Sequence, residues 1–213
     1  MSLTRQKAAQ KADRVVLQNI SWQQFENLLK DLGHQAARLA YDQGTLEIMT
    51  PLPEHEYYKE VIGIAVQDIA EELELDYESL GSTTWKRESR LAAVEPDNCF
   101  YFQNEALIRG KLDFDLTQDP PPDLVLEIDL TSKSLNRFPI YARLGVPEIW
   151  CYDTSELKIY QLQNGDYGET QISLVFPNLA VKEIPRLIEQ NRTAGRRAIR
   201  KAVRAWVREQ CNL

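Results

Sequence analysis

The sequence has few of the residues on which many common functional sites are built. It contains two histidines and three cysteines in 213 residues, and the cysteines form no Cys-x-x-Cys pair. Histidine-rich zinc sites, disulfide frameworks and Ser-His-Asp triads are therefore hard to assemble. We expect reduced thiols and a cytoplasmic location, because structural disulfides belong to oxidising compartments.

Long apolar runs are missing as well. None approaches the roughly 20 residues that a helix needs to span a bilayer. The polar, basic segment 1–13 lacks the apolar core of a secretory signal, so we expect a soluble protein with no membrane partner. No repeat or low-complexity linker divides the chain. We assign 1–13 to a flexible N-terminal arm, 14–191 to one domain and 192–213 to a basic C-terminal helix packed on that domain.

Any chemistry must then rest mainly on carboxylates and cations. The net charge of −7 argues against indiscriminate coating of nucleic acid, but the segment 192–208 holds seven cations and no acid. We expect a final helix over 193–209, and i+3/i+4 spacing puts a set of its cations on one face: Arg197, Lys201, Arg204 and Arg208. These four are candidate contacts for backbone phosphates of nucleic acid. The alternative is that they are solvated or paired with acids of this acidic protein.

Apolar spacing predicts helices over 22–32, with Ser21 as N-cap, and over 54–73. Between them, 38–41 and 45–49 have the pattern of a β-hairpin around Gly44. Further strands are expected at 76–80, 83–87, 99–103, 124–130, 148–152, 157–162 and 171–176.

The segment 124–152 has the pattern of a strand, a helix and a second strand. Asn136 can cap the helix, Pro139 suits its first turn, and Gly145 suits the position after its end, with Pro147 soon afterwards. This unit predicts a parallel strand pair joined by a right-handed crossover. We therefore expect an α/β fold in which one mixed central β-sheet is flanked by helices.

Two acids in the strand at 124–130 are the first candidates for chemistry. Side chains of a strand alternate between faces, so Glu127 and Asp129 point to the same side, away from the leucines around them. Neighbouring carboxylates repel each other and lose hydration near a core. Either this face is solvated, or it holds a divalent cation through carboxylate and carbonyl oxygens.

Asp97 is the third candidate acid. A Pro-Asp-Asn step is typical of a turn, but here it directly precedes the strand expected at 99–103. If that strand lies beside the strand of Glu127, Asp97 and Glu127 can bind one metal ion together. The nearest cations are Lys133, in the loop after the strand, and Arg137, at the start of the crossover helix; either is a candidate phosphate contact or a solvated surface residue.

At these positions the sequence resembles a known family. The resemblance is carried by Pro96-Asp97, by Pro-Asp-Leu-Val-Leu-Glu-Ile at 122–128, by Tyr-Ala-Arg-Leu-Gly-Val-Pro-Glu-Ile-Trp-Cys-Tyr-Asp at 141–153, and by the segment 44–55. These features are similar to the Uma-two family, a bacterial family assigned to the PD-(D/E)XK nuclease superfamily. The resemblance covers roughly residues 20–190 and implies the restriction-endonuclease-like fold.

The resemblance also implies roles for individual residues. Asp97 corresponds to the metal-binding aspartate of the superfamily, and Glu127 to the acid of its (D/E)XK strand. The lysine of that motif falls at position 129, where this chain has Asp129. Many members of the family place a lysine four residues before the tyrosine of the crossover helix, and here that residue is Arg137. Arginine keeps the positive charge but stays protonated and is a poor proton acceptor.

The expected activity is metal-dependent hydrolysis of phosphodiester bonds, with DNA as the favoured substrate. Mg²⁺ or Mn²⁺ would be held by Asp97, Glu127, the carbonyl of Ile128 and Asp129. Arg137 and Lys133 would offset charge on the phosphate. His55 and Glu60 are possible accessory residues, with a cap and a solvated helix residue as their alternatives.

Two other functions stay open at this point. The departure at Asp129 favours a nuclease-like module that has lost catalysis and binds nucleic acid or a protein partner. A purely structural or oligomeric domain is the third alternative. A homodimer is also possible, because dimers are common among restriction-type enzymes.

Overall fold

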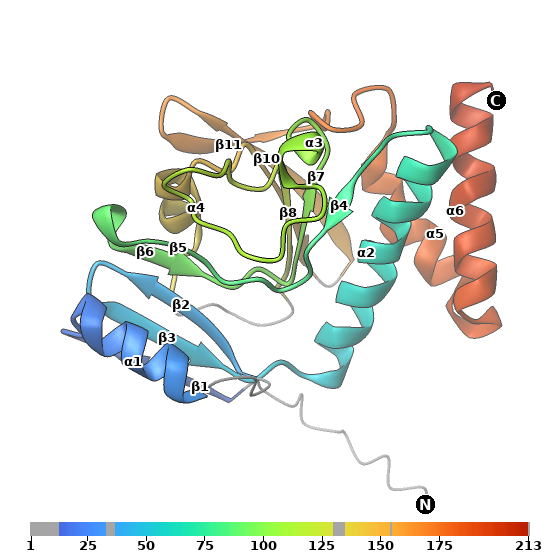
Figure 1. The fold of residues 1–213 in the computed structure, drawn as a ribbon. Coiled ribbons are helices and arrows are strands. Elements are labelled where there is room, and N and C mark those ends of the chain that lie inside the picture. The colour runs from blue at the N-terminus through green and yellow to red at the C-terminus, as the bar shows by residue number, and fades with distance from the viewer. Residues whose placement is uncertain (1–12, 33–36, 130–134, 154, 213) are drawn as a thin grey trace, which may run out of the picture.

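A computed structural model describes residues 13–32, 37–129, 135–153 and 155–212. These residues form two β-sheets with helices around them (Figure 1). The larger sheet has the order β11-β10-β9-β8-β7-β4, and the smaller has the order β1-β3-β2-β6-β5. The α/β class with a mixed sheet flanked by helices is confirmed, and the second sheet is an addition that the sequence did not predict.

The strands of the larger sheet are β4 (Glu78–Ser79), β7 (Asn98–Tyr101), β8 (Leu124–Ile128), β9 (Glu148–Asp153), β10 (Glu156–Gln163) and β11 (Asp166–Thr170). Those of the smaller sheet are β1 (Arg14–Leu17), β2 (Arg38–Asp42), β3 (Thr45–Met49), β5 (Trp85–Arg87) and β6 (Ala92–Val94). The α-helices are α1 (Trp22–Leu32), α2 (Pro53–Glu72), α3 (Glu105–Ile108), α4 (Phe138–Leu144), α5 (Ile184–Asn191) and α6 (Arg196–Cys211).

The crossover unit predicted from the sequence is present. Strands β8 and β9 pair in parallel, whereas the other pairs of this sheet are antiparallel, and α4 connects β8 to β9. Gly145 ends α4 with φ of 86°, a left-handed conformation that glycine adopts without strain. Every residue of β8 is buried, as expected for a central strand covered on both faces.

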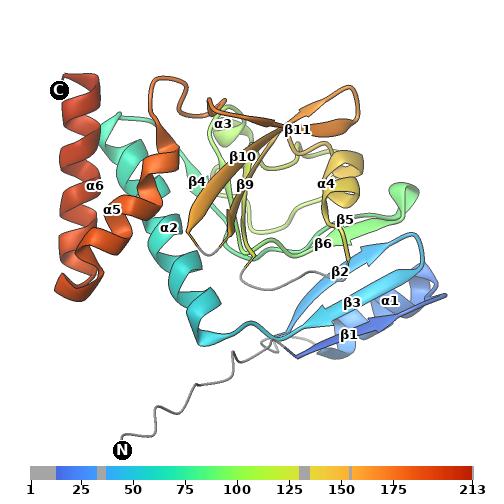
Figure 2. The ribbon, with the colours of Figure 1, turned by 180° about the vertical axis from the view of Figure 1, so that it is seen from behind.

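Different helices pack on the two faces of the larger sheet. Leu124, Leu126 and Ile128 pack with α2, and α5 and α6 pack with α2 in turn (Figures 1 and 2). Gly63 lets α2 approach β7 closely, because a Cβ there would lie 2.6 Å from the Asn98 side chain. Val125 points the other way and packs with α4. Side chains at 127 and 129 therefore point toward the α4 side, and α6 lies beyond α2 on the opposite side.

The smaller sheet carries the predicted N-terminal elements. Ser21 and Gln24 form a capping box at α1: the Gln24 amide donates to Ser21 Oγ at 3.2 Å, and the Ser21 amide donates to Gln24 Oε1 at 2.8 Å. The hairpin of β2 and β3 turns at Gln43 and Gly44, which both have positive φ. The sequence did not predict β1 and β6, each of which is no longer than four residues.

The strand predicted at 171–176 is absent from the described structure. Instead β11 (Asp166–Thr170) forms a hairpin with β10, and the chain after it bends around the buried carboxylate of Glu148. Glu148 accepts hydrogen bonds from Trp150 Nε1 at 2.7 Å, from Ser173 Oγ at 2.6 Å and from the Leu174 amide. A buried acceptor, rather than a strand partner, determines the path of this segment.

Helix α5 was also missed by the sequence analysis, and the helix predicted at 193–209 is observed as α6 over Arg196–Cys211. Among the residues that the structure describes, no helix combines the length and the apolar character that crossing a membrane requires.

Replacing Glu148 by alanine is expected to lower the free energy of unfolding by about 2–4 kcal/mol, because buried donors lose their acceptor. Denaturant titration measures this loss, and the m-value should stay unchanged. Glu156→Ala, at the exposed start of β10, is the matched control and should change stability little. Equal losses in the two variants would contradict this role of Glu148.

Candidate active site around Glu127

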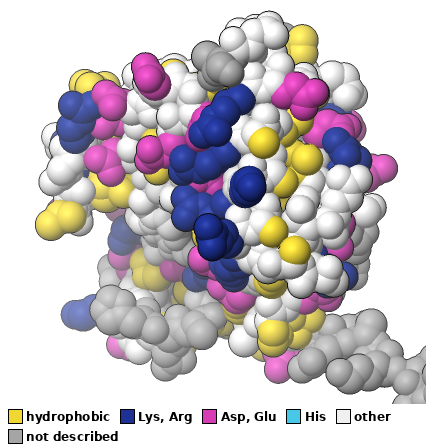
Figure 3. Space-filling model, turned by 90° about the vertical axis from the view of Figure 1, so that its right-hand side faces the viewer, with side chains coloured by type: hydrophobic (Ala, Val, Ile, Leu, Met, Phe, Trp, Pro, Cys, Tyr) yellow, Lys and Arg dark blue, Asp and Glu magenta, His cyan; other side chains and the backbone are white. Residues whose placement is uncertain are grey.

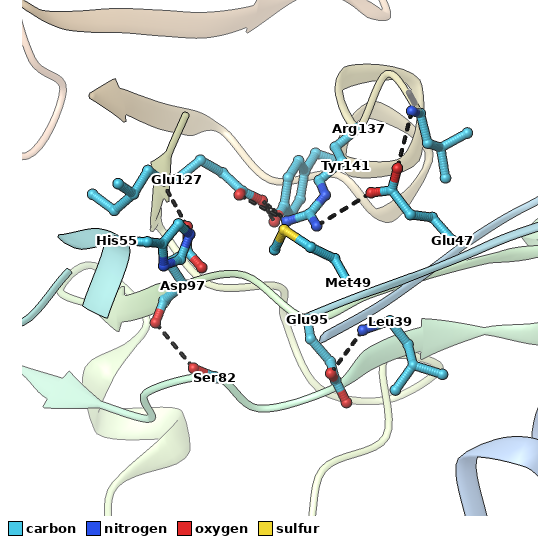
Figure 4. Close-up of polar contacts among 12 residues, drawn as sticks. Leu39, Glu47, Met49, His55, Ser82, Glu95, Asp97, Glu127, Arg137 and Tyr141 are labelled. Carbon is cyan, nitrogen blue, oxygen red and sulfur yellow. Dashed lines mark hydrogen bonds and ion pairs between the residues drawn. The ribbon is translucent and has the colours of Figure 1, made fainter. Parts of the chain in front are cut away.

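Neighbouring strands bring Asp97 and Glu127 together. In the antiparallel pair of β7 and β8, Asn98 is opposite Leu126, so Asp97, one residue before β7, is in register with Glu127. Figure 4 shows the two carboxylates in one group of polar side chains with His55, Arg137, Tyr141 and Glu47.

Asp97 is completely buried, and its two carboxylate oxygens have different surroundings. Oδ2 accepts a hydrogen bond from the Ile128 amide at 2.7 Å and lies 3.1 Å from His55 Nε2. Oδ1 is buried and receives no hydrogen bond from the described part of the chain. Burial raises the pKa of Asp97. His55, the charge of Arg137 and the hydrogen bond from the Ile128 amide lower it by more, so the pKa lies below its ordinary value. Asp97 therefore presents an ionised, partly unsatisfied carboxylate.

Glu127 is held by residues at the start of the crossover helix. Nη1 of Arg137 lies 2.8 Å from Oε2 and 3.2 Å from Oε1 of Glu127, and the Tyr141 hydroxyl donates to Oε1. Burial lowers the pKa of Arg137, but the charges of Glu127, Tyr141 and Asp97 together with the hydrogen bonds to Glu127 outweigh that effect and raise the pKa above its ordinary value. Burial and the charge of Glu127 also raise the pKa of Tyr141, so both donors keep their protons.

Glu47 is a member of this cluster that the sequence analysis missed. It lies on β3 of the smaller sheet, fully buried, with Oε1 3.6 Å from Arg137 Nη2 and Oε2 3.4 Å from Arg14 Nε. The alternation of side chains along β3 was the available signal: it puts Glu47 on the face opposite its apolar neighbours Leu46 and Ile48. The Arg137 guanidinium thus bridges acids from the two sheets.

The predicted metal-binding residues form an all-oxygen set of the kind that Mg²⁺ or Mn²⁺ prefers. The unpartnered Oδ1 of Asp97 fits a metal ligand, and the carbonyl of Ile128 belongs to the residue whose amide binds Asp97. In this structure both oxygens of Glu127 contact Arg137 or Tyr141. No group of three or more His, Cys, Asp or Glu side chains suited to a metal occurs among the described residues. The donor chemistry therefore fits a divalent ion, provided that Arg137 moves away from Glu127.

Four other residues were predicted to belong to the site: His55, Glu60, Asp129 and Lys133. His55, near the start of α2, joins the cluster through Asp97. Glu60, one and a half turns further along α2, is half-exposed and lies 4.0 Å from Arg196 of α6. The structure therefore places Glu60 against α6. Asp129 borders a cavity beside Glu127, and Lys133 lies outside the described residues.

The cations of α6 form a row on the side of the molecule beyond α2, shown in dark blue in Figure 3. The paired alternative holds for part of this row: Arg204 and Arg208 contact Glu72, and Arg204 also contacts the buried carboxylate of Asp68. Arg197 and Lys201 are exposed, with no ion pair in the part of the chain that the structure describes. Because α2 and the sheet separate this row from the α4 side, the row does not border the Glu127 cluster.

Comparison with protein-family models shows the family of the chain. A family model named Uma2, described as "Putative restriction endonuclease", matches residues 22–193. The chain belongs to this family. It is the family that the sequence resembles at Asp97, Glu127 and the crossover segment, and membership supports a nuclease function in general terms.

Among solved structures, the chain is similar to "a putative nuclease belonging to DUF820" from Anabaena variabilis ATCC 29413. The two chains are 14% identical, with a TM-score of 0.48 and coverage of 85% of this chain and 97% of the other. No curated protein matches this Uma2 chain.

Replacing Arg137 by methionine is expected to lower the free energy of unfolding at pH 7 by about 3–5 kcal/mol, because buried carboxylates lose their cation. The charge of Arg137 helps to lower the pKa of Asp97, so without Arg137 this pKa rises in the folded state. The deficit at pH 7 should therefore shrink as the pH falls through the raised pKa toward ~4, near the unfolded pKa of aspartate.

Denaturant titrations at several pH values, in the presence of a chelator, measure this effect. Arg143→Met is a matched control on the same helix, because Arg143 pairs with Asp42 and both are partly exposed. The control should lose less than about 1 kcal/mol. A deficit in Arg137→Met that does not change with pH would contradict the electrostatic role.

Proposed function

We propose that this Uma2 protein is a metal-dependent endonuclease that hydrolyses phosphodiester bonds of nucleic acid, with DNA as the favoured substrate. The observation that carries the proposal is the pair of buried acids, Asp97 and Glu127, on neighbouring strands beside one guanidinium. The unpartnered oxygen of Asp97 supports it further, because a buried polar atom without a partner is costly in a structural site.

In this proposal Asp97, Glu127 and the carbonyl of Ile128 hold Mg²⁺ or Mn²⁺, with Asp129 as a neighbouring acid. The ion, when bound, supplies an activated water and polarises the phosphate. His55 orients Asp97 through Oδ2 and leaves Oδ1 for the ion. Tyr141 keeps Glu127 in position through its hydroxyl.

Arg137 is proposed to contact the phosphate of the substrate. Once Glu127 contacts a cation, the Arg137 guanidinium can turn toward the phosphoryl oxygens and stabilise their charge. It does not act as a base, because its pKa is raised and it stays protonated. A contribution from Lys133 stays a prediction.

The second candidate function is a nuclease-like module without catalysis. The specific observation in its favour is that the Arg137 guanidinium already donates hydrogen bonds to both carboxylate oxygens of Glu127. If the guanidinium never leaves, the protein binds nucleic acid or a protein partner and does not cleave. A cytoplasmic location and a homodimer remain further proposals, and light scattering of the purified chain tests the second.

Incubating the protein with plasmid, single-stranded DNA and RNA in Mg²⁺ or Mn²⁺ tests the main proposal. Cleavage is expected, with DNA preferred. Asp97→Asn and Glu127→Gln should each reduce the rate by about 100-fold or more, the scale seen when one transition-state contact is lost. Both variants keep the shape of the side chain, and circular dichroism checks that they fold.

Glu156→Gln, an exposed acid of β10, is the control and should cleave at the wild-type rate. Binding without cleavage by the wild type would favour the module. Cleavage that survives both Asp97→Asn and Glu127→Gln would overturn the assignment of the site.

The α6 row gives an independent test of nucleic-acid binding. Arg197→Gln combined with Lys201→Gln should lower the salt dependence of binding to double-stranded DNA, reducing the slope of log K against log salt by about 2, since each phosphate contact contributes about 0.9. Fluorescence anisotropy at several salt concentrations measures the slope. Arg186→Gln, an exposed arginine of α5 paired with Glu183, is the control. An unchanged slope in the double variant would show that the row does not contact the backbone.

A further inference from the structure

A cavity of about 440 Å³ opens beside the Glu127 cluster, between β8, β9, β10 and the start of α4. Glu127 and Arg137 form its boundary with the cluster. Asp129, Asp153 and Lys158 also line it. Lys158 belongs to β10, a strand on which the sequence analysis assigned no functional residue.

Strand register places Lys158 in line with Glu127. Lys158 is opposite Cys151 in the antiparallel pair of β10 and β9, and Cys151 is opposite Glu127 in the parallel pair of β9 and β8. Residues in register on adjacent strands project to the same face. Because each strand interval is about 4.8 Å, the two α-carbons are about 10 Å apart. This separation leaves room for a small anion between the two side chains.

The charges around the cavity identify Lys158 as its available cation. Arg137 is 4% exposed and contacts Glu127 and Glu47, so it reaches a phosphate only after it leaves Glu127. Lys158 is half-buried, and within the described residues it has no ion pair or side-chain hydrogen bond. Lysine carries its charge on a flexible four-carbon chain, so it can follow an anion that enters the cavity.

The acids of the cavity indicate what kind of anion it takes. Of the described residues that line the cavity, three are acids (Glu127, Asp129 and Asp153) and two are cations (Arg137 and Lys158). The acids are suited to a divalent cation, and a phosphate group can contact both that cation and the ammonium group of Lys158. The combination of acids with one mobile ammonium is suited to a metal-associated phosphate.

We propose that this cavity binds a phosphate group of nucleic acid and that Lys158 is the side chain that contacts it. The inference rests on the proposed nuclease function for the identity of the ligand. Lys158 supplies charge to the bound phosphate next to Glu127, in addition to the charge that Arg137 supplies once its guanidinium leaves Glu127. It thereby provides a second cation to a site whose (D/E)XK strand has Asp129 in place of lysine.

Binding and cleavage of a short 5′-phosphorylated oligonucleotide in Mn²⁺ test the proposal. All proteins carry Arg197→Gln and Lys201→Gln, so that α6 does not dominate binding. Lys158→Met should weaken binding by about tenfold or more and reduce the salt slope by about 0.7, the value for one contact to a single strand. It should also lower kcat. Lys158→Arg should restore the slope and part of the affinity, because it restores the charge.

Lys182→Met is the matched control, since Lys182 is also half-buried but pairs with Glu169 away from the cavity. The control should keep both binding and slope, and thermal melting checks that all variants are folded. If the protein with Lys158 intact binds the oligonucleotide but does not cleave it, the nuclease proposal fails. The salt dependence of binding then still decides the role of Lys158. The inference would be overturned if Lys158→Met bound the oligonucleotide as tightly as Lys182→Met. It would also be overturned if the protein with Lys158 intact did not bind the oligonucleotide.

Discussion

The buried guanidinium of Arg137 is the interaction on which the rest of the site depends. Glu127 and Asp97 come from neighbouring strands of the larger sheet, and Glu47 comes from the smaller sheet. Carboxylates buried this closely repel one another unless a cation lies among them. Arg137 contacts Glu127 and Glu47 directly, and its charge lowers the pKa of Asp97. The same residue therefore joins the two sheets and supplies the positive charge among their buried acids.

This arrangement also gives a physical account of how a buried site can stay poised for a metal ion. A guanidinium in place of a metal neutralises Glu127 while leaving Oδ1 of Asp97 unsatisfied. In the proposed function, a divalent cation would replace the guanidinium at Glu127 and free Arg137 for a phosphate. Arg137 would then give up contacts in a buried setting, so activity would depend on the balance between metal and guanidinium.

The sequence predicted those parts of the fold whose signals are local. Gly145 and Pro139 define the crossover helix, and Gly44 defines the hairpin, because each residue type has a conformational preference of its own. The segment after Thr170 was wrongly predicted as a strand, since its path depends on Glu148, more than twenty residues earlier. Short strands such as β6 carry too few residues for a periodic pattern.

The residues of the candidate site also differ in whether the sequence indicates them. Strand alternation marks Glu127 and the family resemblance marks Asp97, Glu127 and Arg137, and the structure brings these three together. The positions of Glu47 and Lys158 beside Glu127 depend on sheet pairing that is not readable from one sequence. The α6 arginines were located correctly along the chain, yet only the structure shows that they lie beyond α2 and that several pair with its acids.

The most direct test of the central claim is a crystal structure with Mn²⁺, measured at a wavelength where manganese scatters anomalously. The account predicts an anomalous peak between Asp97 Oδ1 and Glu127, with the Arg137 guanidinium turned away from Glu127. A peak elsewhere, or Arg137 still on Glu127 at saturating Mn²⁺, would contradict it.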